Sequence, residues 1–143
     1  MRQADCYDES NNGVVVMVEP YSQKEQVQQV VLRILDANLD RSREGLRIIE
    51  EWCRFGLNNS EFTRECKHLR QEVAKWHTPD LRAARDTPGD MGTELSHPQE
   101  EQRESVNSLL QANFCRVEEA VRVLEEYGKL YSSGMGKAFK QIR

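Results

Sequence analysis

The chain has 143 residues, of which 38% are hydrophobic and 31% are charged, and its formal net charge at pH 7 is -4. This length suits one domain with a single core and is too short for a large doubly wound sheet. The acidic balance argues against a general nucleic-acid binder and against a protein that adheres to anionic membranes. The longest apolar run, 14–18, is far too short for a membrane span, and no signal peptide is recognisable, so we expect a cytoplasmic protein.

The first half of the chain predicts a helical hairpin. Residues 1–19 are polar and are expected to form a disordered or poorly ordered tail before a helical domain over 20–143. Ser22 and Glu25 have the spacing of a capping box, and apolar residues keep helical spacing from there to about Phe55. Gly56 and Asn58-Asn59 are expected to end this helix. A second helix is predicted over 60–77, where Thr78-Pro79 breaks it before a helical turn over 80–85.

The second half predicts another hairpin. Ser96 to Gln99 has the spacing of a second capping box, so a long helix is expected over 97–131. Gly134 and Gly136 lead into a final helix that carries Phe139 and Ile142. Strand signals are nearly absent, and the sequence therefore predicts an all-α fold.

One 21-residue segment occurs twice, at 35–55 and at 110–130, 75 positions apart. Eight positions are identical in the two copies: Leu35/Leu110, Ala37/Ala112, Asn38/Asn113, Arg41/Arg116, Glu44/Glu119, Arg47/Arg122, Glu50/Glu125 and Glu51/Glu126. Six of these eight are polar, whereas a repeat kept only for packing should retain its apolar positions best. We therefore expect a bundle of two pseudo-symmetric helical hairpins that share a polar arrangement.

The polar positions of the repeat step by three and four residues and lie along one helix stripe. Arg47, Glu50, Arg122 and Glu125 are expected to form ion pairs on the helix surface. Asn38 and Asn113 are different because they interrupt apolar stripes, so each must find a hydrogen-bond partner. They form either a buried polar pair near the pseudo-twofold axis or the lining of a pocket.

In the pocket interpretation, the arginines one turn further along the helices are the substrate-binding cations. Arg41 and Arg116 would present guanidinium groups to one cavity, and Glu44 and Glu119 would orient them. The alternative is that the whole ladder consists of exposed ion pairs.

The only long irregular stretch, 85–93, separates the two copies and has no counterpart in the repeat. Asp86 and Asp90 could hold Mg²⁺, and candidate phosphate contacts come from Arg85, Thr87, Gly89, Gly92 and Thr93. An ordinary turn is the alternative, since Thr-Pro-Gly-Asp is common in turns. The three histidines, His68, His77 and His97, show no metal-binding spacing and are expected at the surface or at helix caps.

Three sequence runs resemble a known family: ILDANLDRSREGLRIIEEWCRF, LRAARDTPGDMGTELSHPQEEQR and ANFCRVEEAVRVLEEYGKLY. They are similar to the small domain at the N-terminus of cyanobacterial-type thiamine-phosphate synthases, which belongs to a compact family of hydroxymethylpyrimidine phosphate kinases. The resemblance covers about residues 20–143. It implies ATP-dependent phosphorylation of 4-amino-5-hydroxymethyl-2-methylpyrimidine phosphate to the diphosphate in thiamine biosynthesis, with Mg²⁺ and ATP as cofactors.

Two other readings stay open at this point. The chain could be a non-catalytic domain that docks on or stabilises a thiamine-phosphate synthase, and this predicts an exposed apolar face. It could instead be a generic helical adaptor that binds a partner helix. A homodimer is also left open, whereas nucleic acid and membranes are not expected as partners.

Overall fold

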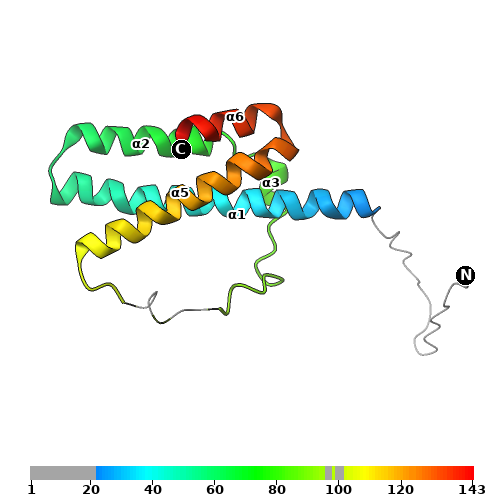
Figure 1. Ribbon diagram of the computed structural model, residues 1–143, viewed down its shortest axis with the longest axis horizontal. Coiled ribbons are helices and arrows are strands. Elements are labelled where there is room, and N and C mark those ends of the chain that lie inside the picture. Colours follow the sequence, from blue (N-terminus) through cyan, green and yellow to red (C-terminus); the bar gives the residue numbers. More distant parts are fainter. Residues whose placement is uncertain (1–21, 96–97, 99–101) are drawn as a thin grey trace, which may run out of the picture.

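The computed structural model describes residues 22–95, 98 and 102–143. Its elements in chain order are α1 (Gln23–Glu51), a π-helical turn η1 (Trp52–Gly56), α2 (Ser60–Ala74), α3 (Pro79–Ala83), α5 (Val106–Tyr131) and α6 (Ser133–Ile142). Figure 1 shows two hairpins, α1 with α2 and α5 with α6, and α5 crosses over α1. Within the described residues no strand is present, so the predicted all-α fold is confirmed.

The first helix begins where its cap predicts. The Ser22 side chain accepts a hydrogen bond from the Glu25 amide at 3.3 Å, and the Ser22 amide donates to the Glu25 carboxylate at 2.7 Å. The second predicted capping box, Ser96 to Gln99, lies outside the described residues. The predicted span 97–131 is wrong over 102–105, because these residues are not helical and α5 starts only after its N-cap Ser105.

The end of the first helix also matches its prediction. The helix widens into the π-helical turn η1 after Glu51, and the chain turns at Asn58, whose φ of 53° lies in the left-handed region that Asn tolerates better than most residues. Asn59 then caps α2 by accepting a hydrogen bond from the Phe62 amide at 2.9 Å. The helices α1 and α2 therefore run antiparallel, and a short connection with a turn residue and a cap residue joins them.

The core lies where α1 is covered by α5 on one side and by α2 on the other, with α6 packed on α5. Its buried members are Val31, Leu32, Leu35, Leu39, Leu46, Val73, Leu81, Val121, Leu124, Met135 and Phe139. At Gly45, α5 approaches the backbone of α1 closely. A Cβ atom at Gly45 would lie 2.6 Å from the Val117 Cγ2 atom and 3.2 Å from the Asn113 carbonyl oxygen.

Glu50 and Glu125 are not the exposed ion-pair residues that their positions in the repeat predicted. They are 5% and 4% exposed. Arg47 lies 3.6 Å from Glu50, and Arg122 lies 3.0 Å from Glu125, so the expected pairs along each helix do form. The prediction failed on burial, because the second helix of each hairpin covers the carboxylate.

That second helix also supplies a cation. Arg70 on α2 lies 2.5 Å from the Glu50 carboxylate, and Arg143 after α6 lies 2.8 Å from the Glu125 carboxylate. These arginines are 73 positions apart, as are the N-cap residues of α2 and α6, Asn59 and Ser132. The pseudo-symmetry therefore extends to both hairpins, with a spacing of 75 for the first helices and 73 for the second.

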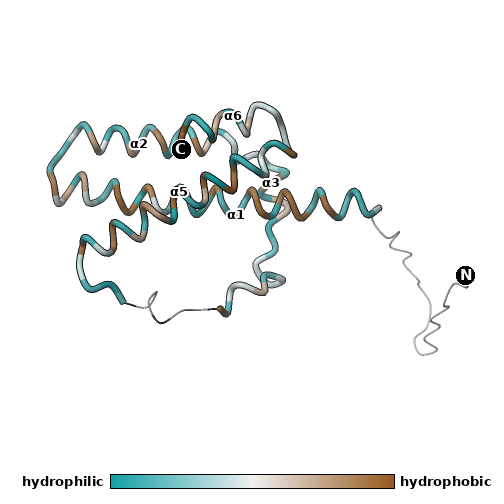
Figure 2. The backbone as a smooth tube through the Cα atoms, viewed as in Figure 1, coloured by the Kyte–Doolittle hydropathy of each residue, from teal (hydrophilic) through white to brown (hydrophobic). Residues whose placement is uncertain are grey.

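Figure 2 shows hydrophobic and hydrophilic residues interleaved along each helix. This is the pattern of helices that bury one face against their neighbours. Among the described residues, no helix combines the length and the apolar character that crossing a bilayer requires.

Candidate functional site

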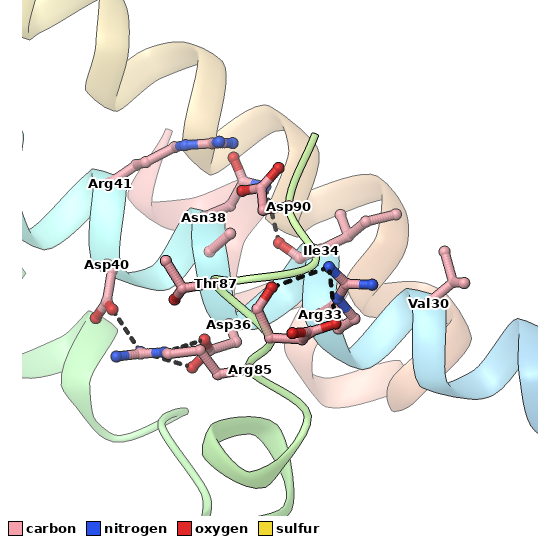
Figure 3. A pocket seen from close by; sticks show the side chains of 12 residues that line it. Val30, Arg33, Ile34, Asp36, Asn38, Asp40, Arg41, Arg85, Thr87 and Asp90 are labelled. Carbon is pink, nitrogen blue, oxygen red and sulfur yellow. Dashed lines mark hydrogen bonds and ion pairs between the residues drawn. The ribbon is translucent and has the colours of Figure 1, made fainter. Parts of the chain in front are cut away.

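A cavity of about 420 Å³ lies between the middle of α1 and the irregular stretch after α3 (Figure 3). Its lining residues are Val30, Arg33, Ile34, Asp36, Ala37, Asn38, Asp40, Arg41, Arg85, Asp86, Thr87 and Asp90. Three arginines, four aspartates and an asparagine therefore surround one small space, with an apolar strip of α1 as its floor.

Arg85 ties the start of the loop to α1. Its Nε and Nη2 atoms donate to the two oxygens of Asp36 at 2.7 and 3.0 Å, and Nη2 also donates to Asp40 at 2.5 Å. The bidentate fork fixes the orientation of the guanidinium as well as its position. Arg85 thus reaches the cavity as a cation that is already neutralised, which differs from the free phosphate-binding role that its loop position predicted.

His77 joins the same cluster and was wrongly predicted as a surface or cap residue. Its side chain is only 2% exposed, and Nε2 lies 3.0 Å from Asp36 and 3.7 Å from Asp40. Within the described part of the chain, Nδ1 of His77 is buried without a hydrogen-bond partner. Burial opposes ionisation of Asp36, but hydrogen bonds from Arg85 and His77 outweigh this and hold the pKa of Asp36 below its ordinary value of 3.8.

A second tie secures the loop one residue further on. Arg33 of α1 donates to the Asp86 backbone carbonyl at 3.2 Å, and its guanidinium lies 3.9 Å from the Asp86 carboxylate. Figure 3 shows Arg85 bonded to Asp36 and Asp40, and Arg33 bonded separately to the loop. Both anchors come from one face of α1, since positions 33, 36 and 40 are spaced by three and four residues.

Asp86 and Asp90 each close a small turn. The Asp86 carboxylate accepts from the Gly89 amide at 3.0 Å, and the Asp90 carboxylate accepts from the Gly92 amide at 2.9 Å. The amides of Gly89 and Gly92 are therefore engaged by the loop itself instead of pointing to a phosphate. Each aspartate retains a second oxygen and lines the cavity.

The two repeated asparagines are buried, as expected, at 6% and 7% exposure. Asn38 donates to the Ile34 carbonyl and Asn113 to the Leu109 carbonyl, both at 2.8 Å along their own helices. Their surroundings differ, because Asn38 lines the cavity whereas the Asn113 carbonyl faces Gly45 at the α1–α5 contact.

Arg41 and Arg116 do not line one common cavity. Arg41 lines the cavity described above, whereas Arg116 lines another of about 580 Å³ that also includes Glu44. Within the described residues, neither arginine forms an ion pair, so the expected orienting pairs with Glu44 and Glu119 are absent.

Six of the thirteen predicted site residues therefore meet in the cavity: Asn38, Arg41, Arg85, Asp86, Thr87 and Asp90. Seven do not: Glu44, Gly89, Gly92, Thr93, Asn113, Arg116 and Glu119. Sequence reasoning missed Arg33, Asp36, Asp40 and His77. The available signal was Asp36, a carboxylate directly beside Leu35 on the apolar stripe of α1.

A smaller cationic cavity adjoins the first. It has a volume of about 300 Å³, shares Asp40 and Arg85 with the main cavity, and adds Arg43, His77 and Arg82. Arg43 is half-buried, and its Nε atom has no hydrogen-bond partner among the described residues. A buried donor on a guanidinium is costly without an acceptor, so this position favours an anion.

Two sets of carboxylates could in principle hold a cation. Asp36, Asp40 and His77 offer ligand atoms within 4.8 Å of one another. However, the Arg85 guanidinium already lies 2.5–3.0 Å from both carboxylates, and a metal there would have to displace it. Asp86 and Asp90 are the other pair, since both line the cavity and each has one oxygen outside its turn hydrogen bond, and Mg²⁺ needs only one or two protein carboxylates.

The fold and the cavity define an all-helical duplicated domain with an arginine- and aspartate-lined site in one of its halves. A family model described as the ThiD2 family matches residues 33–143, and the chain belongs to this family.

Several curated relatives, each described as a thiamine-phosphate synthase, are similar to the chain. The relative from Nostoc punctiforme is 80% identical over 127 residues, which are 89% of this chain and 36% of the relative. The relative from Synechocystis is 66% identical over 113 residues, 79% of the chain and 33% of the relative. That from Gloeobacter violaceus is 56% identical over 116 residues, 81% of the chain and 34% of the relative. The chain thus spans about a third of these relatives, and no solved structure matches it.

Proposed function

We propose that the domain is a hydroxymethylpyrimidine phosphate kinase of thiamine biosynthesis, which uses ATP to convert 4-amino-5-hydroxymethyl-2-methylpyrimidine phosphate into its diphosphate. The observation that carries this proposal is the cavity in which Arg33, Arg41 and Arg85 meet Asp86 and Asp90. Its volume of about 420 Å³ falls in the range of small-molecule sites. Membership of the ThiD2 family supports it.

The chemistry makes modest demands on so small a protein. The nucleophile is a phosphate oxygen whose second pKa is about 6, so it is ionised at pH 7 without a strong protein base. The protein has to hold two polyanions in line and offset their charge. Oriented guanidinium groups suit this task because their forks match phosphate oxygens.

We assign the pyrimidine to the apolar floor of the cavity, formed by Val30, Ile34 and Ala37. The Asn38 amide group already donates to the Ile34 carbonyl, so its side-chain oxygen is left to accept from the exocyclic amine of the pyrimidine. Arg41, without an ion-pair partner in the described residues, then binds the pyrimidine's phosphate.

We assign the triphosphate to the adjoining cationic cavity. Arg43 and Arg82 have no counter-ion among the described residues, and Arg85 lies on the boundary between the two cavities. A phosphoryl group would pass from one cavity to the other beside Arg85, whose position is fixed by Asp36. Mg²⁺, held through Asp86 and Asp90, would neutralise charge on the phosphate oxygens.

Phosphorus NMR tests the proposal directly. The chain is incubated with Mg-ATP and the pyrimidine monophosphate, and we expect a pyrimidine diphosphate to form together with ADP. Arg41→Gln should abolish turnover, whereas Arg64→Gln, an exposed arginine on α2 that lies outside both cavities, should leave it unchanged. Absence of diphosphate, combined with absence of any ligand-dependent rise in melting temperature, would reject the kinase.

A second candidate is a non-catalytic domain that docks on the remainder of a thiamine-phosphate synthase. A separate observation favours it: an exposed apolar groove at the end of the molecule formed by the C-terminal part of α1. Docking by itself is compatible with the kinase, because the groove and the cavity share no lining residue.

A further inference from the structure

An apolar groove of about 400 Å³ lies between the C-terminal part of α1, the N-terminal half of α2 and the N-terminal half of α5. Its lining includes the aromatic residues Trp52, Phe62 and Phe114, and Glu65 is its single charged residue. Contiguous exposed apolar surface of this kind marks an interaction site more often than chance.

The pseudo-symmetry identifies the counterpart of this groove in the other half of the molecule, and there it is closed. Phe114 is 51% exposed, whereas its counterpart 75 positions earlier, Leu39, is fully buried. Phe62 is 53% exposed, whereas its counterpart 73 positions later, Met135, is also fully buried. Equivalent surfaces of one duplicated unit are thus covered in one half and open in the other.

The segment that closes the counterpart is the end of α2 together with α3. Val73 and Leu81 are fully buried in the core beside Leu39, and the Trp76 ring packs against Phe139 with 6.3 Å between centroids. No described residue takes this covering position on the open groove, where Phe62 and Phe114 remain about half exposed.

We propose that the groove binds a short apolar helical segment from the part of the longer relatives that lies outside the matched region, in the position that α3 takes on the other half. This proposal rests on the second candidate function and names the surface that performs the docking. The chain spans 36% of the Nostoc punctiforme relative, so most of that protein is available to supply the segment. Tethering raises its effective concentration to about the millimolar range, so a small contact is enough.

A second copy of the chain is a poorer occupant. A stable dimer buries about 800 Å² on each partner. The exposed large apolar residues that line the groove, Trp52, Leu57, Phe62 and Phe114, are each about half exposed or less, so they leave much less apolar surface in water than such a dimer buries. A helical segment with two or three apolar side chains matches this area better.

Hydrogen–deuterium exchange tests the proposal without reference to turnover. The isolated chain is compared with a chimaera in which it replaces the matched region of the Nostoc punctiforme relative. We expect amides in the N-terminal half of α5 and of α2 to exchange at least tenfold more slowly in the chimaera, and amides in the C-terminal half of α5 to be unchanged. Equal exchange of the groove amides in the two proteins would overturn the proposal. The same comparison on the native Nostoc punctiforme protein covers the case in which the chimaera does not fold.

Two variants identify what the groove contacts. Phe114→Asp should lower the melting temperature of the chimaera by several degrees and leave that of the isolated chain nearly unchanged. Val27→Asp, at a comparably exposed apolar position on α1 outside the groove, should affect neither.

A dimer would give a different result. Slower exchange of the groove amides in the isolated chain at higher protein concentration, together with a dimer mass in sedimentation, would assign the groove to a second copy and overturn the proposal. Kinase activity is not measured, so failure of the kinase and failure of the docking surface are separate results.

Discussion

Glu50 and Glu125 lie 75 positions apart and are held in the same way. Each is buried, each lies close to an arginine three residues earlier on its own helix, and each receives a second arginine from the other helix of its hairpin. The second arginines, Arg70 and Arg143, explain why the polar positions of the repeat are kept. They join the two helices of a hairpin, which an exposed pair on one helix could not do.

Removing this contact should therefore cost more than removing a surface ion pair. Glu50→Gln keeps the shape but removes the charge, and we expect the free energy of unfolding to fall by about 2–3 kcal/mol. Glu51→Gln, at a partly exposed partner of the same Arg47, should change this free energy by less than about 0.5 kcal/mol. Urea unfolding at pH 7 measures the change in both variants. Equal small changes would show that the contact between Arg70 and Glu50 does not contribute to stability.

At Gly45 we expect a substitution by Ala to change stability in the direction opposite to the one that helix propensity predicts. In a helix interior, Gly→Ala ordinarily stabilises by about 1 kcal/mol. Here the added Cβ would lie 2.6 Å from Val117 Cγ2, so we expect Gly45→Ala to destabilise by about 1–3 kcal/mol. Val117→Ala in the same chain should recover part of the loss, and a stabilised Gly45→Ala protein would contradict the close helix contact.

Because of Asp36, the free energy of unfolding should depend on pH in the acidic range. Its pKa is depressed in the folded protein, so its contribution is present above the unfolded value of about 3.8 and is lost as pH falls through the folded value. We expect the free energy of unfolding to fall as pH drops below about 4, and Asp36→Asn to flatten this decline while costing about 3 kcal/mol at pH 7. Thermal melts between pH 2.5 and 7 measure the slope, and an unchanged slope in the variant would refute the role of Asp36.

Variants at Asp86 and Asp90 distinguish a structural role of these carboxylates from a role in metal binding. Both close turns, so Asp86→Asn and Asp90→Asn should each cost no more than about 1 kcal/mol of stability. If they also hold Mg²⁺, turnover should fall severely and the Mg²⁺ concentration for half-maximal rate should rise. Normal rates at normal Mg²⁺ in both variants would leave the loop as a pair of turns.

We expect substitutions at Arg41 and Arg116 to have different effects on turnover, although the two residues occupy equivalent positions in the repeat. Arg41→Lys keeps the charge and loses the fork, so we expect turnover to fall at least tenfold with unchanged melting temperature. Arg116→Lys, in a separate cavity, should leave turnover within about twofold of the wild-type value. A larger loss in Arg116→Lys than in Arg41→Lys would contradict the assignment of the site to the α1 loop cavity.

The sequence predicts the helices well, because apolar spacing, capping residues and Gly or Pro breaks are local properties. The predictions that failed concern tertiary contacts, which local sequence patterns do not determine. Whether Glu50 is exposed depends on where α2 lies, and the role of His77 depends on the contact between the end of α2 and the middle of α1. Asp36 has Gln111 as its counterpart, so the identities of the repeat carry no signal for this carboxylate.

The cavity also reveals how the duplicated unit has been used. Its lining residues fall between Val30 and Asp90, so among the described residues one hairpin and the stretch after it contain the whole candidate site. The other hairpin retains the buried asparagine and the buried glutamate but contributes no lining residue. After duplication, one copy could thus accumulate changes that suit chemistry, while the other was constrained mainly to keep its partner folded. Substitutions of buried residues in α5 and α6 should accordingly act on how much folded protein exists, and substitutions of the cavity-lining residues on what that protein does.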